Sequence, residues 1–207
     1  IMEQEAAPAS QRSQPVEVPQ FMKEILAHMT FEARKSSEIN QSSGVSVRVT
    51  INNFESIISN AEKRALRLKE GEIVPRISDM HSVLASTGGK IEMEYVGEDK
   101  KEEELVEKLL NRALTKVFDQ YFSVNSLQKV IDYFNSGMGA EVSDVMPSQD
   151  YLEGIKEIPG LKEAIRTLGT LESPALMASA TEFILEGLHL HQKLNKEVEG
   201  GRITYGK

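Results

Sequence analysis

Residues 43–66 read SGVSVRVTINNFESIISNAEKRAL, a polar loop with one glycine that leads into an apolar pattern with helical spacing. From residue 51 the apolar positions recur every three or four residues, which is the period of one face of an α-helix. Thr50 is the predicted N-cap, because its hydroxyl can accept a hydrogen bond from the first helical turn. The loop also holds a single arginine, Arg48, between two valines. A plain connector would not require this cation.

Amphipathic segments flank this helix on both sides. The apolar spacing predicts a helix over about 19–37, and Pro75 is expected to open another that ends at Gly88 and Gly89. Further helices are predicted over about 101–122, 127–134, 151–158, 161–168 and 175–195.

Two segments show the alternation of a strand instead of helical spacing. Residues 90–96 read KIEMEYV, and residues 200–205 read GGRITY. An isolated strand would leave its backbone N–H and C=O groups unpaired, so the two segments are expected to pair as a small ribbon. The predicted fold class is therefore mostly α, a helical bundle followed by a helical extension with a small β ribbon.

Composition narrows the range of partners. The chain has 207 residues, a formal net charge of −8 and no cysteine. An acidic chain disfavours nucleic acid, whose binding depends on clustered Lys and Arg. No apolar run approaches the roughly 18 residues of a membrane-spanning helix, so no membrane partner is expected. A chain without cysteine suits the reducing cytoplasm, which is the expected location. Residues 1–16 are polar and contain proline and alanine, as interdomain linkers do, which favours a piece of a longer polypeptide.

The sequence contains few features that are typical of a catalytic site. The stretch STGGKI at residues 86–91 has Ile91 where a phosphate-binding P-loop needs Ser or Thr. His189 and His191 lie two positions apart, so on a helix they point to different sides, unlike the i, i+4 pair of a helical zinc site. No catalytic residue and no metal ligand is predicted. An enzyme that uses carboxylates or these histidines is the least supported reading.

The segment 43–66 resembles the region of AAA+ ATPases in which a loop with a glycine and an arginine leads into a lid helix. The resemblance extends over residues 17–207 and is to ATPases related to magnesium chelatase subunit I and the MoxR-type chaperone ATPases. It implies a lid-like helical domain over 17–87 and a C-terminal helical extension over 88–207. It also implies that Arg48 is the sensor 2 arginine, which reaches the γ-phosphate of ATP. A guanidinium suits that role, because it is permanently charged and forks onto phosphate oxygens.

The same resemblance implies partners and cofactors. ATP and Mg²⁺ would be bound by an upstream AAA+ core domain carrying the Walker motifs, which this chain lacks. Ring neighbours and a von Willebrand factor A-type protein would be the protein partners. The full-length protein would couple ATP hydrolysis to the remodelling of a client or partner. The alternative is a stand-alone, non-catalytic helical interaction module, for which an acidic surface without catalytic motifs is sufficient. Arg64 and Arg76 are competitors for the sensor role; Arg64 is expected to flank the core face of its helix.

Overall fold

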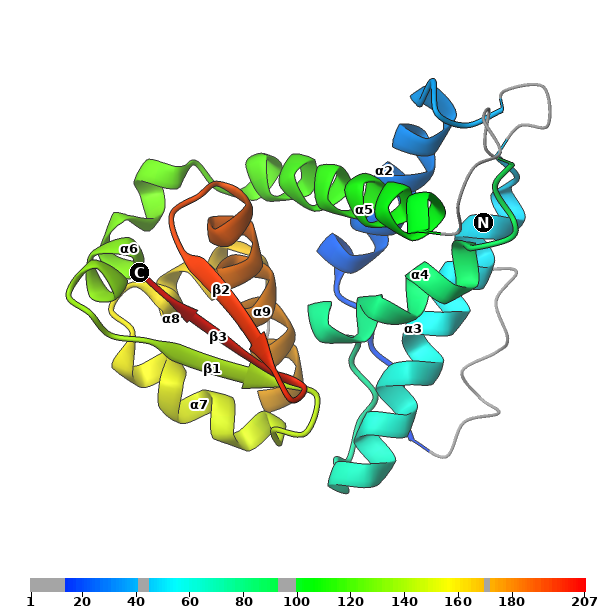
Figure 1. Cartoon of the computed structure of the whole chain (residues 1–207). Coiled ribbons are helices and arrows are strands. Elements are labelled where there is room, and N and C mark those ends of the chain that lie inside the picture. The colour runs from blue at the N-terminus through cyan, green and yellow to red at the C-terminus, as the bar shows by residue number, and fades with distance from the viewer. Residues whose placement is uncertain (1–13, 41–44, 93–99, 170–171) are drawn as a thin grey trace.

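The computed structural model describes residues 14–40, 45–92, 100–169 and 172–207. Within these ranges the chain is mostly α with one small antiparallel sheet, which confirms the predicted fold class (Figure 1). The N-terminal elements are α2 (Gln20–Lys35), α3 (Val47–Leu68), the 3-10 helix η2 (Ile77–Met80), α4 (His81–Thr87) and α5 (Lys100–Tyr121). The C-terminal elements are η3 (Val124–Leu127), α6 (Gln128–Asn135), β1 (Ala140–Ser143), α7 (Ser148–Glu157), α8 (Leu161–Thr167), α9 (Pro174–Leu190), β2 (Asn195–Glu199) and β3 (Arg202–Gly206).

Helix α3 begins one turn earlier than predicted, so the assignment of Thr50 as N-cap is wrong. Ser46 is the N-cap, and its Oγ accepts a hydrogen bond from the Arg48 backbone N–H at 3.2 Å. Val49 is buried on the core face, which extends the apolar stripe into this first turn. Thr50 is also buried, and its hydroxyl lies 2.5 Å from that of Thr30 on α2. Arg48 therefore belongs to the helix and not to the loop before it.

Two other predicted boundaries are corrected. Pro75 does not open a helix: its successor Arg76 is extended, with φ −115° and ψ 168°, and η2 begins at Ile77. The last helix ends at Leu190 instead of about Asn195, because the chain turns at Gln192 with a left-handed φ of 58°. Asn195 is then the first residue of β2. The apolar side chain of Leu194 is buried just before this strand.

The sheet has the order β1–β3–β2, and both pairings are antiparallel. Ile203 of the central strand β3 lies opposite Val142 of β1 and Val198 of β2. Both edges of β3 are occupied, so the predicted pairing of residues 200–205 with residues 90–96 is wrong. Residues 93–96 of that predicted partner lie outside the described ranges, and residues 90–92 form no strand.

Helix α9 is the centre of the C-terminal half, with the sheet in front of it in Figure 1. It contacts α5, α7, α8 and η2, and it is buried on nearly every side, as expected of an apolar helix surrounded by other elements. On the N-terminal side, α2 lies against α5 and α3 against α4. Phe21 of α2 stacks on Phe183 of α9 at 4.6 Å between ring centroids. One contiguous apolar core thus runs from α2 to β3, across the expected boundary at residue 87. The boundaries at residues 16 and 87 stay predictions.

The crossing of α5 and α9 depends on one small residue. A Cβ built on Gly187 of α9 would lie 2.0 Å from Cδ2 of the Phe118 ring on α5. Phe118 is fully buried and lies against the Phe183 and His191 rings, so it has little room to withdraw. Glycine at position 187 is therefore what lets the two helices approach this closely.

We expect Gly187→Ala to lower the free energy of unfolding by about 1–3 kcal/mol, because overpacking a dense core outweighs the better helix propensity of alanine. Gly154→Ala in α7 is the matched control, since a Cβ there meets no atom within 4 Å. That control should gain up to about 1 kcal/mol. Urea unfolding of both variants tests this, and a Gly187→Ala protein as stable as wild type would refute the packing argument.

Candidate functional site

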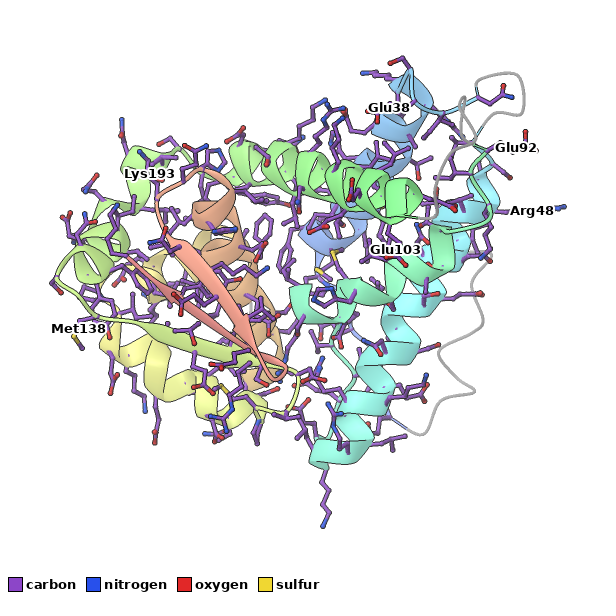
Figure 2. All side chains as sticks on the ribbon, in the orientation of Figure 1. Glu38, Arg48, Glu92, Glu103, Met138 and Lys193 are labelled. Carbon is purple, nitrogen blue, oxygen red and sulfur yellow. The ribbon has the colours of Figure 1, made fainter. Side chains whose placement is uncertain are left out.

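Arg48, the predicted sensor residue, lies in the first turn of α3. Its side chain is exposed and projects away from the body of the molecule (Figure 2). It makes no side-chain hydrogen bond or ion pair with any residue that the structure describes. The N-terminal end of a helix adds a partial positive charge to that of the guanidinium. Among the described residues Arg48 is thus a cation without a side-chain partner, at a helix end that is suited to an anion.

The two histidines singled out by the sequence have separate partners. Nδ1 of His189 lies 3.0 Å from the Leu194 carbonyl oxygen. Nδ1 of His191 lies 2.7 Å from the Gly187 carbonyl oxygen, and its Nε2 lies 2.9 Å from Asp119. Among the described residues, no group of three or more His, Cys, Asp or Glu side chains could hold a metal ion.

The most heavily charged place in the described interior lies elsewhere, where α3, η2, α7 and α9 meet. It consists of two arginines, Arg64 and Arg76, and three acids, Glu70, Asp79 and Glu182, and is called here the arginine cluster. Arg76 is 0% exposed and Arg64 is 2% exposed. Charged side chains are buried this completely only when other groups compensate them.

Arg64 joins the end of α3 to η2. Its Nη2 donates to Oδ2 of Asp79 at 2.9 Å and to the Val74 carbonyl oxygen at 2.6 Å, and its Nη1 donates to Oε2 of Glu70 at 2.9 Å. Burial alone would lower the pKa of Arg64, but Asp79 and Glu70 outweigh it and hold that pKa above its ordinary value. Glu70 reaches this position because Lys69, the C-cap residue that follows α3, has a left-handed conformation with φ 57°.

Arg76 joins that region to the C-terminal half. Its Nη2 donates to Oε1 of Glu70 at 2.9 Å and to Oγ of Ser148 at 2.7 Å. Its Nη1 donates to the Met146 carbonyl oxygen at 2.9 Å, and the guanidinium carbon lies 4.7 Å from the centroid of the Tyr151 ring. Nε of Arg76 is buried without a partner in the described part of the chain. One guanidinium therefore holds the end of α3 to the loop after β1 and to the start of α7.

Glu182, on α9, closes the cluster from the other side. It accepts hydrogen bonds from the Ser78 backbone N–H at 2.7 Å and from the Tyr151 hydroxyl at 2.6 Å. Burial raises the pKa of the Glu182 carboxyl above its ordinary value, and the Arg76 guanidinium opposes that shift. Burial and Glu182 also raise the pKa of Tyr151, which therefore stays a phenol that can donate. A carboxyl with a raised pKa contributes stability that is lost as the pH rises through that value.

The chemistry that this arrangement permits is electrostatic and not catalytic. Two cations face three acids, and burial raises the pKa of one of these acids, Glu182. Arg76 and Asp79 have essentially no exposed surface on which a substrate could land. A surface hollow of about 560 Å³ reaches Glu70 and Ser148, at the edge of the cluster. The cluster thus fixes elements to one another, while Arg48, unlike Arg64 and Arg76, is exposed.

The sequence predicted Arg64 and Arg76 as competitors of Arg48 for the sensor role, with Arg64 flanking the core face of its helix, but it did not predict their ion pairs. One signal was available: the apolar face of α3 runs through residues 57, 61, 64 and 68, so Arg64 occupies a core position in that stripe. For Arg76 the decisive contacts are distant in the chain. Its bond to Ser148 spans 72 residues, and the bond from Ser78 to Glu182 spans 104. No local pattern encodes such contacts.

Comparison with known proteins identifies no relative of this chain. No protein-family model matches the chain, and neither a curated protein nor a solved structure matches it significantly.

We expect Arg76→Met to lower the free energy of unfolding by about 3–5 kcal/mol, because removing one partner leaves buried carboxylates uncompensated. Arg67→Met is the matched control, since Arg67 pairs with Asp144 at the surface, where the two side chains are 51% and 47% exposed. That change should cost no more than about 1 kcal/mol. Chemical unfolding of both variants measures the difference, and equal losses would contradict the role assigned to burial.

Proposed function

We propose that this chain is the lid and C-terminal region of an AAA+ ATPase related to magnesium chelatase subunit I and the MoxR-type ATPases. In this proposal Arg48 reaches the γ-phosphate of an ATP bound on an upstream core domain. The observation that carries the proposal is the position of Arg48: exposed, without a side-chain partner among the described residues, and in the first turn of a 22-residue helix. The resemblance of residues 43–66 to a sensor 2 region supports the same role.

The residues that the structure describes fit part of such a site. Arg48 and the partial positive charge at the N-terminal end of α3 suit phosphate oxygens. The described side chains contain no group of three or more potential metal ligands, so the Mg²⁺ that accompanies ATP would be held by the core domain. When bound, ATP would supply the γ-phosphate whose loss the arginine registers. In this proposal, the role of this chain is to place one permanent positive charge, that of Arg48, at the γ-phosphate.

The arginine cluster suggests how such a signal would travel. Arg64 of α3, which carries Arg48 at its other end, is bonded to Asp79, and Asp79 accepts from the Arg76 backbone N–H. Arg76 is bonded to Ser148 of α7, and Ser78 to Glu182 of α9, and these bonds are buried as well. A force on the N-terminal end of α3 would therefore move the C-terminal half together with the helix. In the proposed ATPase, a change at the phosphate becomes a displacement of the extension, which is where a client or a von Willebrand factor A-type partner would bind.

Location follows the same proposal. No described helix combines the length and the apolar character needed to cross a bilayer. We place the proposed ATPase in the cytoplasm, where ATP is available. The alternative, a stand-alone interaction module, would not respond to nucleotide at all, and this difference makes the two functions separable.

The test is Arg48→Ala in the natural full-length polypeptide, with steady-state ATP hydrolysis and nucleotide affinity as readouts. Loss of a hydrogen bond to a charged group, about 1.5–3 kcal/mol, should slow hydrolysis roughly 10- to 150-fold. Arg202→Ala is the control, because Arg202 is 67% exposed and lies on β3, in the other half of the chain. If hydrolysis and affinity are unchanged in Arg48→Ala, the sensor assignment fails and the interaction module is favoured.

A further inference from the structure

A groove of about 670 Å³ lies between α7 and α8, with the start of α9 at its base. It is in the C-terminal half, away from Arg48, and its residues take no part in the arginine cluster. Two helices packed side by side leave such a groove wherever the side chains that face it are not covered by a third element. The floor, the rim and the length of the groove indicate which kind of molecule can occupy it.

The floor of the groove is apolar. Ile155 of α7 and Ile165 of α8 are buried beneath it, and the half-buried side chains of Leu152 and Met177 line it as well. Leu152 and Ile155 are three positions apart, so they lie on one face of α7. Partly exposed apolar side chains gathered in a concave site gain free energy when a partner covers them.

The rim is basic, on a chain whose net charge is −8. Lys156 stands on the α7 side, and Lys162 and Arg166 stand four positions apart on α8. All three are exposed, and none has a hydrogen bond or ion pair with a residue that the structure describes. One acid, Glu172, also lines the groove. The rim is therefore positively charged, whereas the net charge of the chain is negative, and it attracts negatively charged groups.

A second surface hollow is also lined by three cations, but it is lined by acids as well. It lies between α2 and α5 and has a similar volume, about 660 Å³. There two of the three lining cations form ion pairs, Lys116 with Glu32 and Lys108 with Glu38, and two further acids, Glu104 and Glu107, line the hollow together with the third cation, Arg112. The groove between α7 and α8 differs because its three cations have no such partners among the described residues. Charge complementarity thus selects an acidic occupant.

The dimensions favour a helix as that occupant. Helices of 10 and 7 residues are about 15 and 10 Å long at 1.5 Å per residue, which matches two to three turns of a partner helix. We propose that this groove binds an acidic amphipathic helix of a partner protein, whose apolar side chains cover Leu152, Ile155 and Met177 and whose carboxylates pair with Lys156, Lys162 and Arg166. This is the helix-in-groove mode of recognition. It does not depend on the nucleotide role of Arg48.

The probe is a synthetic peptide of about 12 residues, which is long enough to cover the whole groove as a helix, with leucine at helical spacing on one face and glutamate elsewhere. Binding of the labelled peptide to the 207-residue chain is followed by fluorescence anisotropy. A peptide with lysine in place of glutamate and a scrambled peptide of the same composition are the comparisons. We expect the acidic amphipathic peptide to bind, the lysine peptide not to bind, and the affinity to fall as salt is added.

The location is tested with charge reversal. Lys162→Glu/Arg166→Glu should weaken binding of the acidic peptide at least about tenfold. Lys35→Glu/Lys63→Glu, which makes the same change of net charge on α2 and α3, should leave it unchanged; all four positions are exposed, and circular dichroism checks that the variants fold. The proposal is overturned if the acidic peptide does not bind, if the scrambled peptide binds equally, or if both double variants behave alike. It is also overturned if dodecanoate fills the groove while the peptide does not, since the site would then be one for small amphiphilic acids.

Discussion

The guanidinium of Arg76 is the contact on which the arrangement of the whole chain depends. It is fully buried, and it bonds at once to Glu70 after α3, to Ser148 at the start of α7 and to the backbone of Met146 after β1. Desolvating a cation so completely is costly, and only this set of acceptors compensates the cost. Geometry at this point is therefore tightly specified: a shift of any one of these elements would leave a buried charge without its partner.

Around that point the two halves of the chain are joined in two different ways. At the arginine cluster the contacts are charged and directional, as in the bond from the Ser78 N–H to Glu182. Further along α9 they are apolar: Phe183 stacks on Phe21, and Gly187 admits the ring of Phe118. The apolar contacts supply most of the driving force, while the charged contacts fix one register among the packings that an apolar face alone would permit. Together they make α3 and α9 parts of a single body.

The sequence predicted what depends on local periodicity. The stripe through Phe54, Ile57 and Ala61 located α3, and the same reasoning located α2, α5, α7 and α8 within a few residues. It missed β1, a strand of four residues after a glycine-rich turn, and β2, whose residues are mostly exposed and whose pattern NKEVE has a single apolar position. Strands this short are specified by their neighbours, because β3 supplies the hydrogen bonds for both of them. The arginine cluster was missed for the same reason, since its partners come together only when the whole chain has folded.

The central claim is that α3 and α9 belong to one cooperative unit held by the arginine cluster. Native-state hydrogen exchange, followed residue by residue in increasing denaturant, tests it most directly. We expect buried amides of α3, such as Ile57 and Ile58, and of α9, such as Ile184 and Leu185, to exchange through one opening with the same free energy and the same denaturant dependence. If the α3 amides instead exchange through a separate opening several kcal/mol below that of α9, the two halves are not one unit and the claim is contradicted.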